Sequence, residues 1–173
     1  MFCSSVAAYA PNDIAPIREH YPLNRGPEAG HYSRNKVLCE DMLMEAFARD
    51  GFPATMVRPP YVYGPYNHTE REPRLYARIG QGRKVLIPGE GLTQIHSVHV
   101  DDLAAAFVAI AGRDRTQGQA YNGVGDEAIT ENGYVAAIAE IVGRQAETVH
   151  LDHRQYAEAL DLLDQSRPSA APR

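Results

Sequence analysis

Hydrophobic and polar positions show two different kinds of spacing along the chain. Short apolar runs predict buried or extended strands at residues 2–9, 54–58, 85–87, 95–100 and 120–122. Longer stretches with an apolar residue every three or four positions predict helices at residues 31–50, 70–80, from 101 onward, 130–141 and 155–163. Because strands and helices alternate, the pattern predicts an α/β fold with a mainly parallel sheet.

The helix over residues 31–50 has the clearest pattern. Its apolar stripe consists of Val37, Leu38, Met42, Leu43, Ala46 and Phe47. Gly51 follows where a helix-ending glycine belongs, and the proline-rich stretch before the helix predicts a loop. Residues 61–67 predict an aromatic turn, and residues 165–173 predict a disordered tail.

Composition and charge argue against several classes of protein. The 173 residues are 44% apolar and 23% charged, which is enough to build a packed core. The net charge of −5 argues against a protein that binds nucleic acid or anionic membranes through bulk charge. Cys3 and Cys39 are too few for a disulfide scaffold. No apolar run is long enough to span a membrane and the first residues do not resemble a signal peptide, so we expect a cytoplasmic protein.

Tyr32 and Lys36 are the first candidates for chemistry. A spacing of four places both side chains on one face of the predicted helix, one turn apart. A nearby ammonium favours the phenolate form of a tyrosine, which can then act as a general acid or base. The alternative is a packed surface tyrosine beside a solvated lysine, because a Tyr with a Lys four residues later also arises by chance.

Ser4 and Ser5 end the first predicted strand. Functional sites in parallel sheets form at the carboxyl ends of strands, so a serine hydroxyl here can hold a substrate oxygen beside Tyr32. The alternative is that these serines merely lead the chain out of the strand.

Four motifs occur in a characteristic order. Residues 2–9 look like a strand that ends in a serine four residues before a tyrosine, and Tyr32-Ser-Arg-Asn-Lys36 has the form Tyr-x-x-x-Lys. Residues 57–65 match Arg-Pro-x-x-Val-Tyr-Gly-Pro, and residues 97–104 contain Val-x-Asp-x-Ala at a helix start. Together they resemble the extended short-chain dehydrogenase/reductases, also called the NAD-dependent epimerase/dehydratase family, over about residues 1–145.

This resemblance implies a Ser-Tyr-Lys site. Ser5 would orient the substrate oxygen and Tyr32 would be the acid/base. Lys36 would favour the Tyr32 phenolate and, with Tyr32, bind the nicotinamide ribose. The implied activity is that of an NAD(P)-dependent epimerase/dehydratase or reductase. It would act on a hydroxyl or carbonyl of a sugar-like small molecule, with NAD or NADP bound in the full-length form.

The resemblance also assigns the walls of the site. Pro60 and Val62 would line the nicotinamide pocket through their backbone, and Tyr61 and Asn67 would face the substrate. The implied fold is the carboxyl-terminal half of a Rossmann-type parallel sheet with a small substrate-binding lobe. In that family the Tyr-x-x-x-Lys helix commonly packs against its twin, so we expect a homo-oligomer.

Two departures from the family pattern matter. Residues 1–164 would form a partial domain, because the amino-terminal dinucleotide-binding half with its Gly-rich turn is missing. The nearest match, residues 123–128, we interpret as an ordinary strand-to-helix loop. In addition, Ile95 occupies the position of an arginine that holds the phosphates in many nucleotide-sugar members, so the resemblance does not extend to a nucleotide-sugar substrate.

Other interpretations remain open at this stage. Residues 63–68 also resemble the chloroplast stem-loop-binding branch of the family, so the rival function is a noncatalytic RNA- or protein-binding module. A third possibility is a truncated product without a function of its own. His96, His99, Asp101 and Asp102 suggest a metal site, but histidines three apart on a strand point to opposite faces, so we expect none.

Overall fold

The computed structural model describes residues 1–12, 15–67, 69 and 71–165. The chain divides into two compact units. The first unit comprises residues 1–67 and 96–127, and the second comprises residues 68–95 and 128–173.

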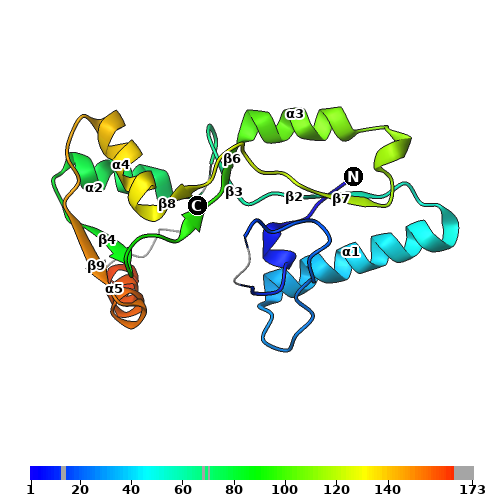
Figure 1. Cartoon of the computed structure of the whole chain (residues 1–173), viewed down its shortest axis with the longest axis horizontal. Coiled ribbons are helices and arrows are strands. Elements are labelled where there is room, and N and C mark those ends of the chain that lie inside the picture. The colour runs from blue at the N-terminus through cyan, green and yellow to red at the C-terminus, as the bar shows by residue number, and fades with distance from the viewer. Residues whose placement is uncertain (13–14, 68, 70, 166–173) are drawn as a thin grey trace. The chain divides into compact units, whose positions relative to one another are not determined.

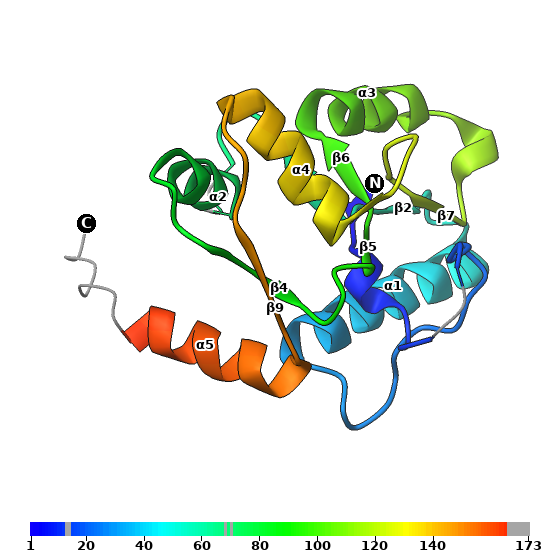
Figure 2. The same cartoon turned by 60° about the vertical axis from the view of Figure 1, so that its left-hand side comes forward.

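A three-stranded parallel sheet is the centre of the first unit. Its order is β1 (Phe2–Cys3), β2 (Thr55–Arg58) and β7 (Gln119–Asn122). All four residues of β2 are buried. Helices α1 (His31–Asp50) and α3 (Val100–Ile110) lie on opposite faces of this sheet (Figures 1 and 2). The predicted α/β fold with parallel strands is therefore confirmed.

Helix α1 has the predicted bounds. Gly51 ends it in the left-handed conformation, with φ of +67°, and its N–H donates to the carbonyls of Ala46 and Phe47. The apolar stripe is only partly covered, because the side chains of Leu38 and Met42 are 53% and 70% exposed. Besides Val37, the buried residue of α1 is a carboxylate, Glu40.

The first strand is shorter than predicted. Strand β1 ends at Cys3, and the 3₁₀ turn η1 (Val6–Ala8) follows where we expected the strand to continue. The cause is local, because the Ser5 hydroxyl accepts a hydrogen bond from the Ala7 N–H and caps this turn.

The aromatic turn expected over residues 61–67 begins as a strand instead. Strand β3 (Tyr61–Tyr63) pairs in parallel with β6 (Ser97–His99), with Val62 opposite Val98. This pairing joins segments more than 30 residues apart, which local turn signals do not report. The 3₁₀ turn η2 (Asp114–Thr116) leads into β7.

The second unit has its own core and two small sheets. Strand β4 (Val85–Pro88) pairs in parallel with β9 (Thr148–Leu151), and β5 (Gln94–Ile95) pairs antiparallel with β8 (Ile129–Thr130). Strands β8 and β9 were not predicted. The helices are α2 (Arg71–Gly80), α4 (Glu131–Val142) and α5 (His153–Gln165), and α2 packs against α4. The core consists of Ile79, Val85, Ile87, Val135 and Ile138.

The last helix is longer than the predicted 155–163, because α5 runs from His153 to Gln165. Gln165 is the last residue of α5, and the rest of the tail predicted over residues 165–173 lies outside the described residues. Within the described ranges, no helix is both long and apolar enough to cross a bilayer.

Candidate active site

Tyr32 and Lys36 lie on one face of α1, at its amino-terminal end. The Lys36 Nζ is 5.5 Å from the centroid of the Tyr32 ring and 5.1 Å from that of the Phe2 ring. It also donates a hydrogen bond of 2.7 Å to the carbonyl oxygen of Cys3. This contact ties the start of α1 to the carboxyl end of β1. The Tyr32 side chain remains 59% exposed.

Ser5 lies at the same end of the sheet. Ser5 is mostly buried, at 9% exposure, and its hydroxyl accepts from the Ala7 N–H at 3.1 Å, so the hydroxyl still has its own proton to donate. The Ser33 hydroxyl, next to Tyr32, donates to the Ala7 carbonyl and holds the first turn of α1 against η1. The structure therefore brings the segments that carry Ser5, Tyr32 and Lys36 together at the carboxyl end of β1.

Pro60 and Val62 follow the neighbouring strand of the sheet. The Ser4 N–H donates to the Val57 carbonyl at 2.7 Å, and the Val6 N–H donates to the Pro59 carbonyl at 3.1 Å. The segment from β2 into β3 thus runs beside the Ser5 segment. The Val62 carbonyl accepts from the Asn67 side-chain amide at 3.3 Å, which directs Asn67 back toward β3. The ring of Tyr61 is mostly exposed.

The aromatic turn after β3 has a strained geometry. Gly64 has a φ of +123°, and a Cβ at this position would lie 2.8 Å from the His99 Nε2, so only glycine fits. Tyr63 contacts the edge of the His99 ring, with centroids 5.2 Å apart. Tyr66 also has a positive φ, of 64°, and its ring is fully exposed.

The two histidines considered for a metal site have backbone partners. The His96 Nε2 is 2.7 Å from the Gly125 carbonyl oxygen, and the His99 Nδ1 accepts from the Asp101 N–H at the start of α3. Among the described residues, no group of three or more His, Cys, Asp or Glu side chains could hold a metal ion.

The glycine pair Gly123 and Gly125 does not form a phosphate-binding loop. The Gly123 N–H donates to the Arg58 carbonyl at 3.0 Å, and the Gly125 N–H donates to the Ser97 carbonyl at 3.1 Å. Both N–H groups are therefore engaged within the protein. A pyrophosphate needs such groups free to donate.

A buried polar network joins β2, α1 and Tyr9 next to the segments of the candidate site. The sequence analysis assigned no role to its members. Arg58 on β2 and Glu40 on α1 form a two-pronged ion pair with N–O distances of 2.9 Å and 2.5 Å. Arg58 also donates to the Tyr9 hydroxyl at 2.8 Å. Burial disfavours the charge on Arg58, yet the hydrogen bonds to Glu40 and Tyr9 outweigh burial and raise the pKa of Arg58. The sequence carried no distinct signal for this pair, because a carboxylate one turn after Lys36 on a helix is ordinarily solvated.

Comparison with known proteins identifies the family. The family model described as the NAD dependent epimerase/dehydratase family matches residues 1–123. This chain belongs to that family. The resemblance predicted from the four ordered motifs is thereby confirmed.

Three relatives show how much of a family member the chain represents. The chloroplast stem-loop binding protein of 41 kDa b from Arabidopsis thaliana is 29% identical over 90% of this chain and 39% of its own length. The dTDP-glucose 4,6-dehydratase from Bacillus anthracis, solved in complex with NAD, superimposes with a TM-score of 0.73 at 22% identity, over 87% of this chain and 48% of that chain. UDP-glucose 4-epimerase from Thermotoga maritima, solved with UDP-glucose, superimposes with a TM-score of 0.71 at 25% identity, over 87% of this chain and 49% of that chain. This chain therefore spans about half the length of these relatives or less.

Proposed function

We propose that this chain supplies the substrate-facing part of an NAD(P)-dependent epimerase or dehydratase that acts on a sugar-like hydroxyl or carbonyl. The observation that carries the proposal is the convergence at the carboxyl end of β1. Lys36 contacts both the Tyr32 ring and the Cys3 carbonyl, and the Ser5 turn is tied to the first turn of α1.

The residues present suit the nicotinamide end of the cofactor. Lys36 uses one N–H on the Cys3 carbonyl and keeps two further donors, and its Nζ lies 5.5 Å from the centroid of the exposed Tyr32 ring. These groups can donate to a ribose diol. Pro60 and Val62 offer an adjacent backbone wall. When bound, NAD(P) supplies the hydride acceptor or donor.

Side chains of this chain transfer the proton in the proposed reaction. The Tyr32 oxygen takes a proton from a substrate hydroxyl as a carbonyl forms, or returns it when the carbonyl is reduced. The Lys36 ammonium stabilises the negative charge on the Tyr32 oxygen. The free hydroxyl proton of Ser5 holds the substrate oxygen in line with Tyr32, while Tyr61 and Asn67 face the rest of the substrate.

Replacement of Tyr32 tests the proposal directly. When the chain is joined to the dinucleotide-binding half of a family member and assayed with nucleotide sugars, Tyr32→Phe should lower kcat by about 100-fold or more. Tyr32→Phe should leave the cofactor affinity nearly unchanged, whereas Lys36→Ala should lower both kcat and the cofactor affinity. The matched control is Tyr66→Phe, at a fully exposed ring with no assigned role in the reaction, which should keep full turnover. Full activity in the Tyr32→Phe protein would remove the assignment.

A second candidate function is nucleic-acid binding without redox chemistry. It is favoured by the 29% identity to the chloroplast stem-loop binding protein over most of the chain. The net charge of −5 opposes it, because phosphate contacts require basic side chains. Tight, strongly salt-dependent binding of an RNA stem-loop, together with no loss on Tyr32→Phe, would favour this function over the enzyme.

A further inference from the structure

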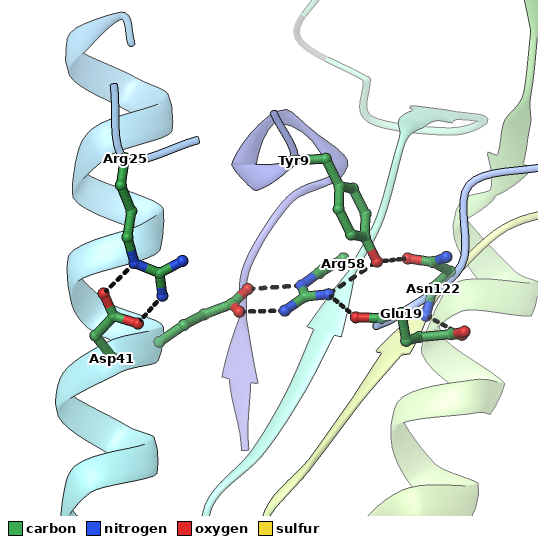
Figure 3. Close-up of polar contacts among 7 residues, drawn as sticks. Tyr9, Glu19, Arg25, Asp41, Arg58 and Asn122 are labelled. Atoms are coloured by element: carbon green, nitrogen blue, oxygen red, sulfur yellow. Dashed lines mark hydrogen bonds and ion pairs between the residues drawn. The ribbon is translucent and has the colours of Figure 1, made fainter. Parts of the chain in front are cut away.

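The guanidinium of Arg58 is held by three separate segments of the first unit. Both carboxylate oxygens of Glu40 on α1 accept from it, and its remaining nitrogen donates to the Tyr9 hydroxyl and, at 2.9 Å, to the Glu19 carbonyl. Figure 3 shows Arg58 with Tyr9, Glu19 and Asn122 gathered on one side of it. Arg58 and Glu40 are only 4% and 2% exposed, so this is a buried pair of charges.

The network continues from Tyr9 to the end of the sheet. The Tyr9 hydroxyl donates to the Asn122 side-chain oxygen at 2.7 Å, and the Asn122 N–H donates to the Glu19 carboxylate at 3.0 Å. The last residue of β7 is thereby joined to the same cluster.

The spacing of these residues relates the network to the candidate site. Glu40 is one helical turn after Lys36, and Tyr9 is four residues after Ser5. Arg58 stands two residues before Pro60. The Arg58 guanidinium thus connects its own strand, which leads to Pro60, with the Ser5–Tyr9 segment and with helix α1. These are the segments that carry the candidate catalytic and cofactor-binding residues.

We infer that Glu40 and Arg58 are positioning residues, which fix α1 and β2 relative to each other and so hold Lys36 at the Cys3 carbonyl. The inference rests on the proposed function where it calls that place a catalytic site. A two-pronged pair between a planar guanidinium and a carboxylate sets orientation as well as distance, which a contact between apolar side chains does not.

Stability alone does not account for this pair. Desolvation of two buried charges offsets most of their attraction, and apolar side chains of similar volume often replace such a pair without loss of stability. The positioning role and a purely structural role therefore make different predictions. If Glu40 and Arg58 position Lys36, an apolar pair that restores the packing should still let Lys36 leave the Cys3 carbonyl. If their role is purely structural, the same apolar pair should leave Lys36 in place.

Lysine side-chain NMR of the chain as it exists can separate the two roles. The protein has two lysines, Lys36 and Lys84, so labelled lysine gives one signal for each. Because Lys36 lies over the rings of Phe2 and Tyr32, ring currents should displace its side-chain proton signals upfield. Lys84, which pairs with Glu147 in the second unit, provides the internal reference.

The decisive variant is the double replacement Glu40→Leu/Arg58→Met. It should fold with a cooperative melt, yet the upfield displacement of the Lys36 signals should be lost while those of Lys84 stay in place. The matched control is Asp41→Leu/Arg25→Met, the same exchange at the exposed ion pair one residue along α1. The control should leave the Lys36 signals unchanged.

A conservative variant keeps the test decisive if the double replacement does not fold. Arg58→Lys retains the charge and loses the two-pronged geometry, so it should move the Lys36 signals part of the way. Unchanged Lys36 signals in any folded variant of Glu40 or Arg58 would overturn the inference. The signal requires no substrate, so it is independent of turnover, and retained activity in Tyr32→Phe would refute only the proposed function.

Discussion

Tyr9 is a buried side chain through which the stability of the fold depends on pH. Its ring is buried, its hydroxyl donates to Asn122, and Arg58 donates to the same hydroxyl. Burial raises the pKa of Tyr9, although the hydrogen bond and the positive charge of Arg58 oppose that rise. Burial likewise raises the pKa of Tyr134 in the second unit, and its hydrogen bond to Glu72 raises it further. Both residues thus favour the neutral phenol in the folded protein.

These raised pKa values predict a loss of stability at alkaline pH. The unfolded chain releases the tyrosine proton above about pH 10, whereas the folded protein retains it, so the unfolded state binds fewer protons. The stabilisation is complete below about pH 10 and should be lost as pH rises through the higher pKa of the folded state. Urea unfolding at a series of pH values measures the decline. Tyr9→Phe should make the decline shallower, and an unchanged slope would contradict the role of Tyr9.

At the scale of elements, local signals predicted some features well and missed others for a physical reason. The bounds of α1 were predicted because a glycine that ends a helix and a 3.6-residue pattern are both local. Strands β3 and β9 were missed because each is short and is stabilised by a distant partner, β6 and β4 respectively. Spacing singled out Tyr32 and Lys36 as candidates, and the resemblance of the four ordered motifs supplied their roles. Glu40 could not be proposed, because its partner Arg58 lies 18 residues away and a helical carboxylate is ordinarily solvated.

The end of α1 depends on the left-handed backbone conformation of Gly51. Gly51 has a φ of +67°, and an added Cβ would meet no atom within 4 Å, so the cost of Gly51→Ala is purely conformational. We expect a loss of about 1 kcal/mol in the free energy of unfolding, measured by urea denaturation. Gly80→Ala is the comparison, because this residue is helical and its Cβ would make an ordinary contact with Val142. It should cause no loss, since Ala favours helix over Gly. Equal losses in both variants would contradict the argument.

On the scale of the whole molecule, the first unit leaves apolar surface uncovered. Strand β1 is an outer strand of the β1-β2-β7 sheet, and its residues supply neither a charge nor a proline that would block pairing with another chain. Leu38 and Met42 on α1 are exposed although they belong to its apolar stripe. A soluble monomer rarely leaves such surface open, so these features favour association.

We therefore predict that the 173-residue chain forms a homo-oligomer at micromolar concentration, with α1 in the contact. Sedimentation measures the assembly state. The double variant Leu38→Glu/Met42→Glu should shift the population toward a monomer of 19.1 kDa, because a glutamate buried in the contact has no partner charge. The control is Val108→Glu, at a position that is 77% exposed. Val108 belongs to α3, the helix on the opposite side of the sheet from α1 (Figure 1). The control should leave the assembly intact. A parent protein that sediments as a single 19.1 kDa species with a sharp melt would mean that the chain has covered its own apolar surface and that α1 is not a contact helix.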